Sequence, residues 1–439
     1  MITSTPGLQG GFIWEWKDHG LRQRRPDGST RLAVGGDFGD TPHDGNFVAD
    51  GLVSADGEPH PALREVAWVY RPVTVHHSDH GGRRLVVANR QSFTGLDGYR
   101  FDWELLIDGD LVQRGRLEVP EVAPHSSASV PLPCKVPAAG GEAHLTVRIS
   151  TRRATWFAPA GHLVAWDQVV LRTGTPARAP VRRRATNSTP LDGVLSSPPE
   201  ICIRRAAIDN DGYKLMPDLS ERLGIGGQAL RAWRESGVET LPAESLVRHT
   251  WHCEPDGGGA LSAIYRHRVE VPAGLADIAR VGVRFSLPSR FGARRWFGRG
   301  PHENYPDRNR SAMVGIWHEP PDANPYLVPQ EFGLRCDVRW MELVCADTGE
   351  TLRIDSLGAV PLHMSVTRYS VEDLLAARNE ADLVPADDLV VHLDAAHRGL
   401  GTASCGPDVL TQYRLRAGTY RFAYRLWLVD RPARRGGRR

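Results

Sequence analysis

Alternation of apolar and polar side chains is the feature that most restricts what this chain can fold into. Phe101, Trp103, Leu105 and Ile107 alternate with polar positions such as Asp102. Successive side chains of a strand point to opposite faces of a sheet, so this spacing predicts a half-buried strand. The Asp-Gly pair at 108–109 then favours a hairpin turn into a second strand over 111–119.

The same period recurs along residues 71–171. Alternating apolar positions at 145, 147 and 149 and a run over 163–171 predict further strands. About 100 residues of short strands separated by turns are typical of an immunoglobulin-like sandwich. The 45 glycines and 32 prolines among the 439 residues favour strands and turns over long helices. A chain of this length should hold two to four domains.

Composition excludes several functional classes. A formal net charge of +2 gives no reason to expect a nucleic-acid partner. The six cysteines show neither a CxxC pair nor metal-ligand spacing, and their sparseness fits a reducing compartment. The histidines at 76, 77, 80, 249 and 252 likewise lack a zinc-like partner set. Without a signal-like start or an apolar run of about 18 residues, we expect a cytoplasmic protein with no membrane partner.

The first 73 residues cannot form a core alone. They offer one predicted strand over 11–16, loops rich in Gly, Asp and Pro, and a helix over 61–70. Leu63, Val66, Ala67 and Tyr70 fall at helical spacing, and Pro61 suits the first turn. One strand and one helix need a neighbour to pack on, which predicts a missing partner segment.

The rest of the chain is again predicted to be mostly strands. Residues 173–199 have the composition of a linker, and 431–439 form a basic, Gly-rich tail expected to be disordered. Between them, residues 201–430 are interrupted by helical patterns near 230–234 and 371–380.

Two groups of motifs resemble glycoside hydrolase family 2 β-galactosidases. Residues 10–16 (GGFIWEW), 35–42 (GGDFGDTP) and 46–52 (NFVADGL) are similar to the last strand and sugar-site loop of that family's catalytic (β/α)8 barrel. Residues 296–308 (WFGRGPHENYPDR) resemble the hallmark of its large C-terminal sandwich. Shorter similarities occur in the following segments: 161–168 (GHLVAWDQ), 209–211 (DND), 329–335 (PQEFGLR), 368–370 (RYS) and 417–420 (AGTY).

The resemblance implies a mainly β fold for the C-terminal portion of such an enzyme. We expect a barrel remnant over 1–73, an immunoglobulin-like sandwich over 74–172, a linker over 173–199, a mutarotase-like supersandwich over 200–430, and the tail. The stretch 171–205 is shorter than the family's connection, so the first strands of the last sandwich are expected to be absent or replaced. That would leave a sheet edge unpaired.

No catalytic residue is predicted in this chain. Retaining glycosidases need two carboxyl groups about 5 to 5.5 Å apart, and in this family both are glutamates on earlier barrel strands. The pair Asn379-Glu380 lies far outside the barrel motif and is interpreted as a chance match. Glu15 has no catalytic role in the family pattern and is expected to face away from Trp14.

The resemblance does imply part of a sugar-binding shell. Trp14 matches an indole that forms a wall of the galactose subsite, although a tryptophan outside such a motif would more simply belong to a core. Phe47 and Asp50 match residues that bind a sodium ion near the sugar through a backbone carbonyl and a side-chain oxygen. Aspartate replaces the family's asparagine at position 50. The magnesium of the intact family would have its ligands outside this chain.

The leaving-group side is less complete. In the loop 399–407 (GLGTASCGP), Cys405 stands nearest to the position where some members present a tryptophan, and a buried structural thiol is its simpler interpretation. Polar residues of the hallmark motif, His302, Glu303, Tyr305 and Asp307, are expected to hydrogen-bond internally rather than to a sugar.

Three functional hypotheses remain open at this stage. The chain is one subunit of a split β-galactosidase that assembles with an N-terminal fragment, or the product of a truncated gene, and in both cases it is inactive alone. Alternatively, it is a non-catalytic carbohydrate-binding or aldose-epimerase-like protein, which would need its own histidine and carboxylate pair.

Overall fold

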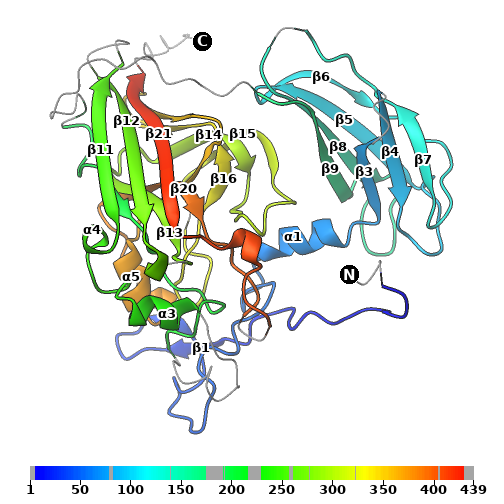
Figure 1. Cartoon of the computed structure of the whole chain (residues 1–439). Coiled ribbons are helices and arrows are strands. Elements are labelled where there is room, and N and C mark those ends of the chain that lie inside the picture. The colour runs from blue at the N-terminus through cyan, green and yellow to red at the C-terminus, as the bar shows by residue number, and fades with distance from the viewer. Residues whose placement is uncertain are drawn as a thin grey trace, which may run out of the picture.

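The computed structural model describes a mainly β protein. It covers residues 5–78, 83–138, 140–174, 191, 193–215, 229–256, 261–275, 277–321, 323–403 and 406–429. Two β-sandwiches are joined by helix α1 (Ala62–Val69) and an N-terminal segment (Figure 1). The predicted linker lies largely outside the described residues, as does the predicted basic tail.

The first sandwich is the one predicted from two-residue alternation. Its sheets have the strand orders β3-β4-β7 and β6-β5-β8-β9. Their strands are β3 (Val73–His77), β4 (Arg84–Asn89), β5 (Tyr99–Ile107), β6 (Asp110–Arg116), β7 (Ser127–Pro131), β8 (Ala143–Thr151) and β9 (Leu163–Arg172).

Side chains of β5 and β8 carry the core of this sandwich. Phe101, Trp103 and Leu105 are buried, as the alternation predicts. The predicted hairpin follows β5, because Asp108 and Gly109 both have positive φ, at 51° and 87°. Such a turn matches the right-handed twist of the paired strands.

The second sandwich packs a five-stranded sheet against a seven-stranded sheet. The strand orders are β10-β13-β20-β19-β16 and β11-β12-β21-β18-β17-β14-β15. The first sheet consists of β10 (Glu200–Cys202), β13 (Arg280–Pro288), β16 (Arg335–Val338), β19 (Leu362–Thr367) and β20 (Asp388–His397). The second consists of β11 (Arg248–Pro255), β12 (Ser262–Val271), β14 (Ala293–Gly300), β15 (Met313–Glu319), β17 (Trp340–Val344), β18 (Thr351–Leu357) and β21 (Gly418–Val429).

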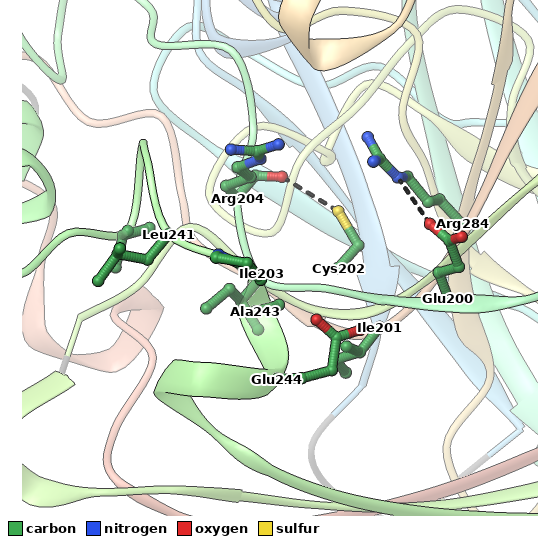
Figure 2. A pocket seen from close by; sticks show the side chains of 11 residues that line it. Glu200, Ile201, Cys202, Ile203, Arg204, Leu241, Ala243, Glu244 and Arg284 are labelled. Carbon is green, nitrogen blue, oxygen red and sulfur yellow. Dashed lines mark hydrogen bonds and ion pairs between the residues drawn. The ribbon is translucent and has the colours of Figure 1, made fainter.

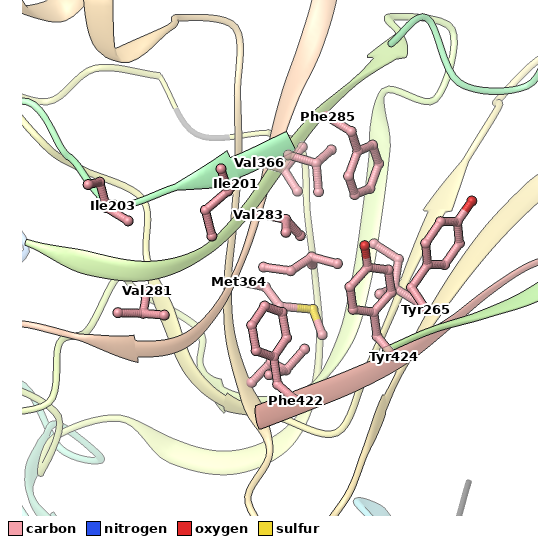
Figure 3. Close-up of a cluster of buried hydrophobic side chains, with 14 of the residues drawn as sticks. Ile201, Ile203, Tyr265, Val281, Val283, Phe285, Met364, Val366, Phe422 and Tyr424 are labelled. Carbon is pink, nitrogen blue, oxygen red and sulfur yellow. The ribbon is translucent and has the colours of Figure 1, made fainter. Parts of the chain in front are cut away.

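Aliphatic and aromatic side chains from both sheets meet between them (Figure 3). Val283 and Met364 from the smaller sheet are fully buried, as is Tyr424 from the larger one. Rings on neighbouring strands stack, with centroids 5.2 Å apart for Tyr265 and Tyr424. Such pairs add to the hydrophobic burial that holds the layers together.

β10 lies at one edge of the five-stranded sheet. Among the described strands it pairs only with β13, through Glu200, Ile201 and Cys202. The short helix α4 (Ala243–Leu246) packs beside it, and α3 (Ala229–Glu235) and α5 (Val371–Ala376) form near the predicted helical patterns.

The strand predicted over 11–16 is not formed. Only Lys17 makes a bridge, parallel to Val53, and the regular strands nearby are the hairpin β1 (Leu21–Arg24) and β2 (Thr30–Ala33). The backbone N–H and C=O groups of a strand need hydrogen-bond partners along its whole length. Here, of residues 11–16, only Glu15 and Trp16 form backbone hydrogen bonds with residues 50–53. Helix α1 is confirmed, yet none of its residues is buried.

Polar anchors join the two sandwiches. The Gln168 side chain both donates to the carbonyl of Val314, at 2.8 Å, and accepts from its N–H, at 2.8 Å. The Trp166 indole donates to the carbonyl of Ser311 at 2.9 Å. No helix in the described part of the chain is long and apolar enough to cross a membrane.

We expect Gln168→Ala to weaken this junction. The substitution leaves both main-chain groups of Val314 without their side-chain partner, at a cost of about 1–3 kcal/mol. Denaturant unfolding should show the change for Gln168→Ala but not for Gln113→Ala, which removes one exposed bond to a carbonyl. An unchanged transition for Gln168→Ala would contradict the anchoring role.

Stability should fall in mild acid because of a buried histidine. Burial lowers the pKa of His267 from 6.5 to about 3, with His249 and His252 adding to the effect. A lowered pKa stabilises the fold above pH 6.5, and this contribution is lost as the pH falls towards 3. Between pH 7 and pH 5, His267 alone should account for about 2 kcal/mol of lost stability.

Chemical denaturation at the two pH values tests this expectation. His267→Gln keeps an amide for the bonds to Tyr424 and His249 but does not titrate, so its pH dependence should be smaller. The exposed His125 provides the control, His125→Gln. Equal pH dependence in all three proteins would show that His267 does not drive the acid effect.

Candidate functional site

Two short stretches of the N-terminal segment run side by side and create the candidate site. Leu52 N–H donates to the carbonyl of Glu15 and Val53 N–H to that of Trp16, each at 3.0 Å. Gly51 permits the approach, since a Cβ there would lie 2.3 Å from the backbone nitrogen of Asp18. Asp18 completes the junction by accepting from Gly51 N–H at 2.7 Å and pairing with His60 at 2.9 Å.

Trp14 presents its indole to solvent. Its exposed fraction is 78%, and the neighbouring Phe12 and Trp16 are also exposed. The Trp14–Glu15 peptide bond is cis. The indole is thus not a core side chain, and its face is open to a ligand.

Asp50 lies close to Glu15, and the acidic pair is the second feature of the candidate site. Burial, together with the charge of the nearby Glu15, raises the pKa of Asp50 to about 6. Glu15 also pairs with His19 at 2.9 Å. No place in this site was predicted for Glu15, because its position depends on the backbone pairing with residues 50–53, which no local sequence pattern shows.

Phe47 sits in a turn that the second sandwich supports. Its N–H donates to the carbonyl of Asp44, and Ala49 N–H donates to that of Asn46, both at 3.0 Å. The edge of the Phe47 ring meets Tyr213, with centroids 5.9 Å apart.

The residues present fit a hard monovalent cation, which would be held by oxygen atoms. Oδ1 of Asp50 and Oδ1 of Asn46 are buried and have no hydrogen-bond partner among the described residues. Clustered acidic groups beside an unpaired oxygen favour a positive ion. In the described part of the chain, no group of three or more His, Cys, Asp or Glu side chains could hold a metal by themselves, so carbonyl or external oxygens would be required.

His302, Glu303 and Asp307 of the hallmark motif form hydrogen bonds inside the protein, as expected. The expectation fails for Tyr305, whose buried hydroxyl has no hydrogen-bond partner among the described residues. Glu303 accepts from Gly333 N–H at 2.7 Å, from Arg308 at 2.6 Å and from the Tyr326 hydroxyl at 2.8 Å. Asp307 accepts from the N–H groups of Leu400 and Gly401, at 2.9 and 2.8 Å.

Asp307 thereby fixes the start of the loop 399–407. Cys405, the residue expected nearest to the leaving group, lies outside the described residues.

Asn379 and Glu380 are distant from the motif in sequence but close to the N-terminal segment in space. The Asn379 amide donates to the carbonyl of Leu32 at 2.7 Å and its oxygen accepts from Ala381 N–H at 3.0 Å. Asn379 is thus a structural cap that also anchors β2.

A histidine and carboxylate pair of the kind an epimerase would need is present but enclosed. His397 and Glu331 are 3.6 Å apart, beside Arg280 and Asp394, and all four side chains are buried. Burial lowers the pKa of His397 to about 3. A sugar could not reach this pair without opening the sandwich.

A cavity of about 290 Å³ lies at the β10 edge, between that strand and α4 (Figure 2). Its two arginines are already paired: both Arg204 and Arg284 contact Glu372, Arg284 at 3.0 Å. The thiol of Cys202 donates to the carbonyl of Arg204 at 3.3 Å. These internal contacts already occupy both arginines and the thiol that line the cavity.

Comparisons with known proteins agree with the motifs. A family model described as β-galactosidase small chain matches residues 184–426, and one described as β-galactosidase domain 4 matches 85–172. The TIM barrel domain of glycosyl hydrolases family 2 matches residues 1–75.

Curated relatives are named β-galactosidase. The protein from Arthrobacter sp. (strain B7) is 31% identical over 478 residues, which cover 95% of this chain and 46% of the relative. That from Aeromonas hydrophila is 30% identical and covers 94% and 45%, and that from Priestia megaterium is 31% identical and covers 90% and 42%. The chain spans about half the length of these relatives.

Among solved structures, the Amycolatopsis orientalis exo-chitosanase shares 11% identity over 61% of this chain and 25% of that chain, with a TM-score of 0.22. This score is too low to indicate a shared arrangement. The sequence matches, by contrast, extend over more than half of the chain. The chain belongs to the β-galactosidase family within glycoside hydrolase family 2.

Proposed function

We propose that this chain supplies part of the sugar pocket of a retaining β-galactosidase and is inactive by itself. The observation that carries the proposal is the open half-site: Trp14 is exposed, and the next residue, Glu15, bonds through its backbone to Asp50 and Leu52, in the loop that follows Phe47. The enzyme formed with an N-terminal fragment would hydrolyse terminal β-galactosides in lactose-type carbohydrate catabolism, in the cytoplasm.

The described residues do not supply the reaction's two carboxyl groups. Retention needs an acid/base and a nucleophile about 5 to 5.5 Å apart, with room for the sugar carbon between them. Glu15 lies close enough for its charge to raise the pKa of Asp50, and the family resemblance gives neither of them a catalytic role. Both catalytic glutamates would come from the partner fragment.

Within the pocket, each residue has a separate role. The Trp14 face would stack on the apolar C–H groups of the galactose ring and exclude water from that side. The Phe47 carbonyl and the Asp50 carboxylate would hold a sodium ion, whose charge would orient a sugar hydroxyl. Any magnesium would bind outside this chain.

Exposed apolar side chains support a partner. Large apolar side chains of the N-terminal segment stay exposed: Leu8, Phe12, Ile13, Trp14, Trp16, Leu21, Phe38, Val69 and Tyr70. A segment this apolar would be stabilised by a covering protein surface. The other strands and helices of a (β/α)8 barrel would provide such a surface, and we propose that the partner carries them.

We expect activity only in the assembled enzyme. The chain should not hydrolyse a nitrophenyl β-galactoside alone, but should do so when produced together with the N-terminal half of the Arthrobacter relative. Size-exclusion chromatography should show a complex of the two polypeptides. Hydrolysis by the purified chain above a mock-purified control, or the absence of a complex, would contradict the proposal.

In that complex, Trp14→Ala should lower kcat/KM at least about tenfold, the equivalent of about 1.4 kcal/mol. The control is Trp156→Ala, since Trp156 is also exposed, at 95%, but lies on the first sandwich. Both variants should still form the complex. Equal kcat/KM for the two variants would show that Trp14 does not contact the sugar.

A further inference from the structure

A carboxylate of the second sandwich reaches into the turn that carries Phe47. Asp209 Oδ1 accepts a hydrogen bond from the Asn46 side-chain amide at 3.1 Å, across 163 positions of sequence. Asn46 has an exposed fraction of only 2%. A bond to a charged acceptor in so closed a place is stronger than a typical neutral one.

The segment around Asp209 is itself held firmly. Asp211 pairs with Arg205 at 2.8 Å and with Arg398 at 3.2 Å, all three side chains being buried. Asn210 donates to the carbonyl of Gly401 at 2.7 Å. Asp209 therefore contacts Asn46 from a segment whose next two residues are tied to the sandwich.

A second contact from the same sandwich segment supports Phe47 itself. Tyr213 meets the Phe47 ring edge-on, at an interplanar angle of 78°. Lys214 follows, and its ammonium donates to the carbonyls of Pro329, Leu374 and Ala377 at 2.5 to 2.7 Å. The turn is thus held at Asn46 by a hydrogen bond and at Phe47 by a ring contact.

We propose that Asp209 is a positioning residue for the half-site of Trp14, Phe47 and Asp50, acting through Asn46. The turn bonds of Phe47 and Ala49 fix the backbone between Asn46 and Asp50. A shift at Asn46 would therefore move both the Phe47 carbonyl and the Asp50 carboxylate. What the half-site binds rests on the proposed function, but its positioning by Asp209 does not.

Hydrogen exchange in the isolated full chain tests the positioning directly. Asp209→Ala should speed exchange of the Phe47 and Ala49 amides roughly tenfold, which corresponds to one lost hydrogen bond of about 1.4 kcal/mol. Amides of β13 and β20 should keep their protection. Asp27→Ala is the matched control, because this exposed carboxylate bonds to Ser29 in its own turn.

A donor–acceptor swap separates positioning from general destabilisation. Asn46→Asp combined with Asp209→Asn exchanges the two groups while keeping the number of charges, so exchange should return to within about twofold of the native rate. Unchanged exchange in Asp209→Ala would overturn the proposal. So would equal acceleration throughout β13 and β20, or failure of the swap to restore protection.

In the complex with an N-terminal half, Asp209→Ala should raise KM about tenfold and change kcat less than about threefold, because the half-site binds ground and transition states alike. A fall in kcat at constant KM would contradict a positioning role. If no complex forms, the proposed function fails while the exchange experiment still decides the role of Asp209.

Discussion

The N-terminal segment depends on polar anchors from the second sandwich, because it buries little apolar surface of its own. The Glu65 carboxylate accepts from the backbone N–H groups of Arg310 and Ser311, at 3.2 and 3.0 Å. The Asn379 amide donates to the carbonyl of Leu32, and the Asp209 carboxylate accepts from the Asn46 amide. Directional bonds of this kind fix an orientation that weak hydrophobic packing would leave loose, so the geometry of the candidate site follows from the sandwich beneath it.

The hallmark motif explains how that sandwich offers such anchors. The carboxylates of Glu303 and Asp307 accept hydrogen bonds from backbone N–H groups. The amide oxygen of Asn304 likewise accepts from Cys336 N–H at 3.0 Å. The neighbouring residues 310 and 311 then present their own N–H groups outward, where Glu65 accepts them. A motif rich in His, Glu, Tyr and Asp can therefore be required for architecture without contacting a substrate.

The sequence predicted those parts of the fold whose cause is local. Alternation located β5 because every second side chain at its centre is buried. Helical spacing located α1, although none of its residues is buried. The strand over 11–16 failed because its pairing depends on residues 50–53, which no local pattern shows. The contacts of Glu15 with Asp50 and of Asp209 with Asn46 were missed for the same reason: each joins residues far apart in the chain.

The charges of the half-site also indicate what completes it. Asp50 is partly buried beside Glu15. Burial, with a smaller contribution from the charge of Asp50, raises the pKa of Asp209 to about 6. Adjacent carboxylates of this kind are stabilised by a shared proton or by a cation. A cation would use the unpaired oxygens of Asp50 and Asn46, and would leave the exposed Trp14 face to the sugar. In the assembled enzyme that we propose, an ion at the carboxylates and a sugar on the indole would therefore occupy separate places.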